Sequence, residues 1–126
     1  NFFPGEVTKS ENGKLSISTD SMGKIDIPVS NSEYAARTPI WVAIRPEKLK
    51  PVFIKPENLI NVIQGVMGPS AYLGDRSHFY VHLSNREEPV LVALQNLERS
   101  IDLLRGPNQK VWLKWSTDAL VVLPRD

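Results

Sequence analysis

The sequence predicts an all-β protein made of two small lobes with one short helix. A length of 126 residues fits one domain or two small coupled lobes. Ten prolines and seven glycines favour many short elements joined by turns over a few long helices. In several segments apolar residues alternate with polar ones, which is the period of a strand with one buried face.

The N-terminal part shows this alternation first. Leu15 and Ile17 alternate with serines, and the dipeptide Asn12-Gly13 precedes them. Asn-Gly is a strong hairpin signal because both central residues of a type I′ turn need a positive φ. The sequence therefore predicts a hairpin over 5–19 and a second turn over 21–24.

The segment 40–44 is apolar at every position, which predicts a central strand buried on both faces. Three prolines follow within 45–58 and disfavour regular ladder pairing, so this stretch is predicted to be an extended connection. We place the lobe boundary at its end. The N-terminal β lobe, with the crossover strand and the proline-rich connection, then spans 1–58, and the C-terminal β lobe spans 59–126.

The C-terminal lobe has the strand spacing of a barrel or a sandwich. Its predicted strands lie within 60–67, 79–83, 90–94, 111–115 and 120–123. The one helical pattern places Leu97, Ile101 and Leu104 on one face, with Asn96 as N-cap and Gly106 at the end. No repeat of fixed period is visible along the chain.

The composition excludes several classes of function. The chain has no Cys, which excludes disulfides, thiolate catalysis and cysteine-ligated zinc. No apolar run approaches the ~18–20 residues that a membrane-spanning helix needs, and the sequence shows no basic-then-apolar signal pattern, so we expect nothing here to span a membrane. Since the chain begins at Asn1 rather than Met, we expect a processed chain or the C-terminal fragment of a longer one.

No constellation of residues predicts catalysis or metal binding. His78 and His82 would share one face of a helix, but in a strand they lie roughly 13 Å apart, too far to bind one metal ion. The chain lacks a G-x-S-x-G elbow and both glycine-rich phosphate-binding motifs. We therefore predict no catalytic residue, no metal ligand and no cofactor site of its own.

A nucleic-acid-binding barrel is the natural alternative, since small β-barrels often bind oligonucleotides. Lys48, Lys50 and Lys55 near Phe53 are the closest approach to a basic stripe with an aromatic residue. The net charge of only +1 argues against this function, and no nucleic acid is expected as a partner. Trp41, Trp112 and Trp115 are interpreted as core residues, with a ligand-stacking platform as the alternative.

Four segments together resemble a known family. The segment 42–49 resembles the motif V-x-[IL]-R-P-E-x-[IL], and 72–75 resembles Y-L-G-[DS]. The segment 111–123 is similar to the family's closing hairpin, and 1–5 resembles N-F-[IL]-x-G. The family is the transport-associated OB-like (TOBE) region, which follows the ATPase domain in the ATP-binding subunits of importers. The resemblance implies an OB-like β-barrel of the TOBE type.

Within that family, 92–96 and 118–123 look most like the subunits of putrescine/spermidine importers. The resemblance implies a non-catalytic regulatory or accessory domain of an ABC transporter ATP-binding subunit. The parent subunit would dimerise at the cytoplasmic face of the bacterial inner membrane and contact the membrane subunits of the transporter. It would hydrolyse ATP, with magnesium, using residues outside this chain. The alternatives are a purely structural dimerisation module for another substrate and the nucleic-acid binder considered above.

The motif residues are the candidate site. Pro46 keeps Arg45 extended and makes the chain leave its strand there, so Arg45 is predicted to pair with Glu47 or Asp75. Gly74 is predicted to supply a positive φ at a turn on the barrel rim. The candidate interface or ligand rim comprises Arg45, Pro46, Glu47, Tyr72, Leu73, Gly74 and Asp75, and the candidate polyamine contacts are Tyr72, Asp75, Glu87 and Glu88.

Overall fold

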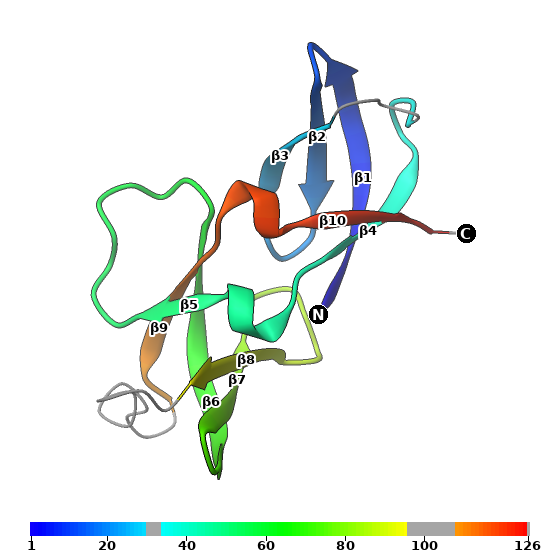
Figure 1. Cartoon of the computed structure of the whole chain (residues 1–126). Coiled ribbons are helices and arrows are strands. Elements are labelled where there is room, and N and C mark those ends of the chain that lie inside the picture. Colours follow the sequence, from blue (N-terminus) through cyan, green and yellow to red (C-terminus); the bar gives the residue numbers. More distant parts are fainter. Residues whose placement is uncertain (30–33, 96–107, 126) are drawn as a thin grey trace. The chain divides into compact units, whose positions relative to one another are not determined.

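The computed structural model describes residues 1–29, 34–95 and 108–125, and it is all-β as predicted (Figure 1). The predicted helix falls within 96–107, outside the described residues. The strands are β1 (Phe2–Glu11), β2 (Lys14–Thr19), β3 (Lys24–Pro28), β4 (Pro39–Ala43), β5 (Lys50–Val52), β6 (Val62–Leu73), β7 (Arg76–His82), β8 (Val90–Gln95), β9 (Lys110–Lys114) and β10 (Val121–Pro124). Two single-turn 3-10 helices, η1 (Pro46–Lys48) and η2 (Thr117–Ala119), precede β5 and β10.

The chain forms two compact units, each with one five-stranded antiparallel sheet. Unit 1 comprises Asn1–Ile44 and Ser116–Asp126, with the strand order β10-β4-β1-β2-β3. Unit 2 comprises Arg45–Trp115, with the order β5-β9-β6-β7-β8. This division differs from the predicted lobes 1–58 and 59–126. The reason is that β5 pairs with β9, and β10 pairs with β4.

The two units repeat the same architecture. In each, four consecutive strands form most of the sheet, and the fifth strand comes from the other half of the chain. Backbone hydrogen bonds recur at equivalent places: the amide of Ile44 donates to Asn1 (3.0 Å), as that of Trp115 donates to Asn61 (3.2 Å). The sequence shows no fixed period because the connection before the fourth strand is longer in the second half.

The predicted hairpin over 5–19 is confirmed. β1 and β2 pair antiparallel, with Gly5 opposite Thr19 and Glu11 opposite Lys14. Asn12 (φ 54°) and Gly13 (φ 70°) both have the positive φ of a type I′ turn. The predicted second turn is also present, with Gly23 at φ 75°.

The sheet of unit 1 has one buried face. Its inward side chains are fully or almost fully buried and are Phe3, Val7, Leu15, Ile17, Ile25, Ile27, Ile40 and Val42. On the outward face of β2 and β3, Ser16 donates to Asp26 (2.7 Å) and Lys14 lies 3.7 Å from the same carboxylate. The segment 40–44 is central as predicted, since β4 pairs on both edges, but it is not buried on both faces because Trp41 and Ala43 are half-buried.

The sheet of unit 2 confirms the predicted strands within 60–67, 79–83, 90–94 and 111–115. The predicted absence of ladder pairing in 45–58 is wrong for three residues, because β5 pairs with β9. β5 is an edge strand, where a proline such as Pro51 is tolerated. The core side chains of this unit include Leu49, Met67, Phe79, Val81, Val90, Val92, Val111 and Leu113.

Each sheet curls so that its two edge strands approach each other. η2 leads into the edge strand β10 and contacts β3, the opposite edge of unit 1. η1 leads into the edge strand β5 and contacts β8, the opposite edge of unit 2. Each unit is therefore a small five-stranded OB-like barrel closed by a 3-10 turn.

Candidate functional site

The motif around Arg45 forms the 3-10 turn of unit 2. Arg45 is extended (φ −71°, ψ 144°), as expected before a proline, and Pro46 begins η1. The amide of Lys48 donates to the carbonyl of Arg45 (3.0 Å), and Leu49 after the turn is buried. These residues thus position the turn that contacts β8.

The predicted ion pair of Arg45 is wrong. The Arg45 side chain is exposed and pairs with neither Glu47 nor Asp75 within the described residues. The Asp75 carboxylate is instead 4.0 Å from the guanidinium of Arg76. Both of these side chains are largely exposed, so their attraction contributes little stability.

The segment 72–75 forms the hairpin turn between β6 and β7. Leu73 pairs with Arg76, which leaves Gly74 and Asp75 as the two central turn residues. Gly74 has a φ of 69°, as predicted, whereas Asp75 does not have a positive φ, and this combination is that of a type II′ turn. The backbone of Tyr72 pairs with Ser77.

The candidate polyamine contacts do not converge. Asp75 precedes β7, whereas Glu87 and Glu88 lie in the connection between β7 and β8. A strand of seven residues separates the two positions, which corresponds to roughly 20 Å. The connection is ordered by a bond from Arg86 Nε to the carbonyl of Glu88 (2.9 Å), and partial burial lowers the pKa of Arg86 against the opposing effect of Glu88.

The two histidines lie on β7, as the sequence indicates. The His82 ring lies beside Gly68, because a Cβ added there would be 3.0 Å from its Nε2 atom. Within the described ranges no group of three or more His, Cys, Asp or Glu side chains could hold a metal ion.

The interpretation of the three tryptophans as core residues is wrong for two of them. Trp115 is buried, as expected for a core residue, but Trp41 and Trp112 are only half-buried. In β4 and β9 the alternate residues Ile40 and Val111 face the core, so both tryptophans face outward. Trp41 contacts Phe2 edge to face at 6.4 Å and lies 5.5 Å from the guanidinium of Arg125.

Among the described residues, two hollows were not predicted from the sequence. A polar hollow of about 330 Å³ in unit 1 is lined by Glu6, Thr8, Ser18, Asp20 and Arg125, among others. A groove of about 900 Å³ in unit 2 is lined by residues 51–56, Gln109 and Lys114. Lys55 and Phe53 were noted in the sequence, but only the pairing of β5 with β9 brings Lys114 beside them.

The fold defines an OB-like domain, and the comparisons agree. The chain belongs to the TOBE domain family, whose model matches residues 42–123. A solved structure of the cytoplasmic molybdate-binding protein ModG, with molybdate bound, has the same fold. Its TM-score is 0.81 at 12% identity, over 99% of this chain and 96% of that one.

Among curated proteins, the chain is similar to the ATP-binding proteins of polyamine transport. It is 28% identical to the spermidine/putrescine import ATP-binding protein PotA of Trichodesmium erythraeum (strain IMS101), over 95% of this chain and 32% of that protein. It is 36% identical to the putrescine transport ATP-binding protein PotG of Escherichia coli (strain K12), over 68% of this chain and 22% of that protein. The chain thus spans about a third or less of the curated relatives it matches. In the part of the chain that the structure describes, no helix has the length and apolarity to cross a membrane.

Proposed function

We propose that this chain is the non-catalytic accessory domain of an ATP-binding subunit in a polyamine importer. The TOBE match carries the proposal, and the relatives PotA and PotG support its assignment to putrescine and spermidine import. On this proposal ATP and magnesium bind to another part of the subunit. The domain works at the cytoplasmic face of the inner membrane, with its own ATPase domain, a second copy of the subunit and the membrane subunits as partners.

The proposed role is regulation of the transport cycle by polyamine. A ligand shifts a conformational equilibrium only when it binds one arrangement of the subunits better than another. A polyamine needs carboxylates, and we take three groups of them among the described residues as candidates. These are Asp75 at the β6–β7 turn, Glu87 with Glu88 after β7, and Glu6 with Asp20 in the polar hollow of unit 1.

Calorimetry with spermidine tests direct binding to this chain. We expect saturable binding that one carboxylate-to-amide substitution weakens: Asp75→Asn, Glu87→Gln with Glu88→Gln, or Glu6→Gln with Asp20→Asn. The substitution that weakens spermidine binding identifies which of the three places is the site. Direct sensing is wrong if the unmodified chain shows no binding and if removing this domain from the longer subunit leaves inhibition by polyamine unchanged.

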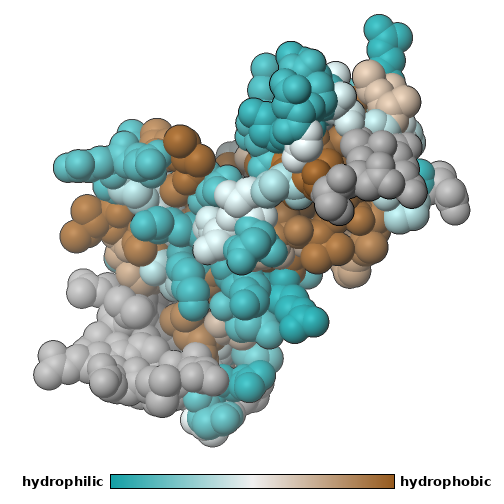
Figure 2. All heavy atoms as spheres, turned by 45° about the horizontal axis from the view of Figure 1, so that its top comes forward, coloured by the Kyte–Doolittle hydropathy of each residue, from teal (hydrophilic) through white to brown (hydrophobic). Residues whose placement is uncertain are grey.

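A structural dimerisation module is the second candidate, because the outward face of unit 1 is apolar over three strands. Phe2 and Val121 both pair with Ala43, and Pro4 and Leu123 both pair with Trp41. Phe2 is 55% exposed and Val121 is 52% exposed. Figure 2 shows apolar side chains gathered over one part of the surface. Exposed apolar patches of this kind mark interaction surfaces.

Sedimentation velocity over a range of concentrations tests this second candidate. We expect Val121→Lys to shift a dimer toward the monomer, because it places a charge on the edge strand of the apolar face. The control is Val66→Lys, on the outward face of unit 2, which should leave the assembly unchanged. A chain that stays monomeric at every concentration, or that responds equally to both substitutions, would exclude dimerisation through this face.

A further inference from the structure

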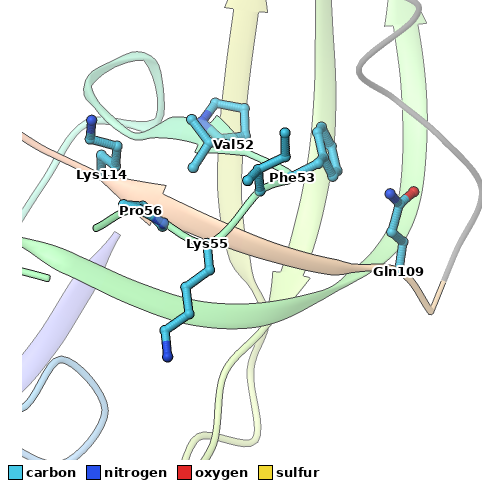
Figure 3. A pocket seen from close by; sticks show the side chains of 8 residues that line it. Val52, Phe53, Lys55, Pro56, Gln109 and Lys114 are labelled. Carbon is cyan, nitrogen blue, oxygen red and sulfur yellow. The ribbon is translucent and has the colours of Figure 1, made fainter. Parts of the chain in front are cut away.

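The groove of unit 2 combines an apolar floor with cationic side chains. Its volume is about 900 Å³, at the upper end of the range of small-molecule sites. Pro51, Val52, Phe53 and Pro56 supply apolar surface, and the side chains of Lys55 and Lys114 extend from the loop and from β9 (Figure 3). Gln109, near the start of β9, adds an amide at the far end (Figure 3).

Among the described residues, the lysines around this groove have no acidic partner. Lys50 lies directly opposite Lys114 in the pairing of β5 with β9. Neither forms an ion pair or a hydrogen bond through its ammonium group within 34–95 and 108–125, and the same holds for Lys55. The strands β5, β6 and β9 contain no Asp or Glu, and the described acids in the segments next to them are Glu47, Glu57, Asp75 and Asp118.

The fold does not require these lysines. Because the two units have the same architecture, their equivalent positions can be compared. Ala43 in unit 1 is equivalent to Lys114 in unit 2, and Val121 is equivalent to Lys50. Like charges directly opposite each other on neighbouring strands destabilise a sheet. The repulsion between Lys50 and Lys114 therefore destabilises the folded chain. An anion bound in the adjacent groove would reduce this repulsion.

We propose that this groove binds a freely diffusing organic anion with an apolar body, which contacts Pro51, Val52 and Phe53 and is held by Lys114 or by Lys55, whose side chains point in opposite directions in Figure 3. Either ammonium group favours a carboxylate, sulfonate or phosphate ester, since a charged acceptor makes the stronger hydrogen bonds. The apolar floor distinguishes such a ligand from an inorganic anion, and the positive charge excludes a polyamine. The site is thus separate from the polyamine regulation proposed above and does not depend on it.

Titration of the isotope-labelled chain with 2-naphthalenesulfonate, followed by amide NMR shifts, tests the proposal. We expect saturable shifts at 52–55, at Gln109 and at Lys114. Sodium sulfate and the neutral 2-naphthalenemethanol should each bind less tightly. Replacing Lys55 and Lys114 together by Met keeps the aliphatic stems and removes the charges, so the affinity should fall about tenfold or more. The matched control is Lys24→Met, an exposed lysine of unit 1, which should leave the affinity unchanged.

Three outcomes would overturn the proposal. Shifts that fail to saturate at these residues, or that centre on the apolar face of unit 1, would show that the groove is not the binding site. An affinity that is unaffected by the paired Lys→Met substitutions would remove the role of the charges. Stronger binding to phosphatidylglycerol vesicles than to the soluble sulfonate would assign the basic groove to a membrane surface instead.

Discussion

The substitution Gly65→Ala should destabilise the chain more than the same substitution at the equivalent Gly5. Both glycines are buried, Gly5 in β1 and Gly65 in β6. Gly5 pairs with Ile40 of β4, and Gly65 pairs with Val111 of β9. A Cβ at Gly65 would overlap Val81 Cγ1 and lie 2.9 Å from the carbonyl oxygen of His82. At Gly5 the closest atom is Ile17 Cγ2, at 3.0 Å, followed by a carbonyl oxygen at 3.2 Å.

The expected magnitude follows from these contacts. Overpacking of a tight core lowers the free energy of unfolding by about 1–3 kcal/mol. Replacing Gly by Ala raises it by roughly 0.4–1 kcal/mol, because Ala lowers the conformational entropy of the unfolded chain. Because the backbone oxygen of His82 cannot move away as a side chain can, we expect a net loss of about 2 kcal/mol at Gly65. At Gly5 the neighbouring side chains can shift by a few tenths of an ångström, so the net change should lie within about 1 kcal/mol of zero.

Urea denaturation of the two variants and the unmodified chain, followed by circular dichroism, measures both changes. The comparison is internal, since the two substitutions have the same chemistry in equivalent strands. A Gly65→Ala variant as stable as the unmodified chain, or a larger loss at Gly5, would refute the reasoning from close approach.

Three further predictions concern single sites. Gly74→Ala should cost about 1 kcal/mol in thermal unfolding through its φ of 69° alone, because no atom lies within 4 Å of the added Cβ, and a larger loss would indicate a contact. Phe79→Ala, which empties a fully buried position, should cost roughly 3–5 kcal/mol in urea denaturation, and a loss under 1 kcal/mol would contradict its place in the core. Glu11→Gln should lower the raised pKa of Lys9 in an NMR titration, because Glu11 raises it through a 2.8 Å contact; an unchanged pKa would exclude that pair.

If the dimerisation candidate and the groove proposal both hold, the two units differ in function. Unit 1 presents an apolar outward face with Val121 and Ala43, and unit 2 presents Lys50 and Lys114 at the same places. One architecture thus carries two surfaces of different chemistry. An accessory domain of this kind can contact a protein through one unit and a small ligand through the other.

The sequence by itself determined the features that depend on neighbouring residues. The turn at Asn12-Gly13, the positive φ of Gly74 and the extended Arg45 before Pro46 all follow from the conformational preferences of one or two residues. Alternation along each strand likewise identified most of the buried faces, because the period of a strand is a local property. The resemblance of the motifs to a known family predicted the OB-like fold.

The tertiary structure alone decided which strands pair across the chain. β5 and β10 each pair with a strand from the other half of the sequence. A strand of three or four residues carries no local signal of a partner roughly sixty residues away, as for β5, or roughly eighty, as for β10. Because β5 pairs with β9 and β10 pairs with β4, the boundary between the units differs from the predicted one, and Lys50 lies opposite Lys114. Asp75 and Glu87 lie apart for a local reason, since they flank the extended strand β7. Spacing along the chain therefore predicted the elements, and long-range pairing determined the surfaces they form.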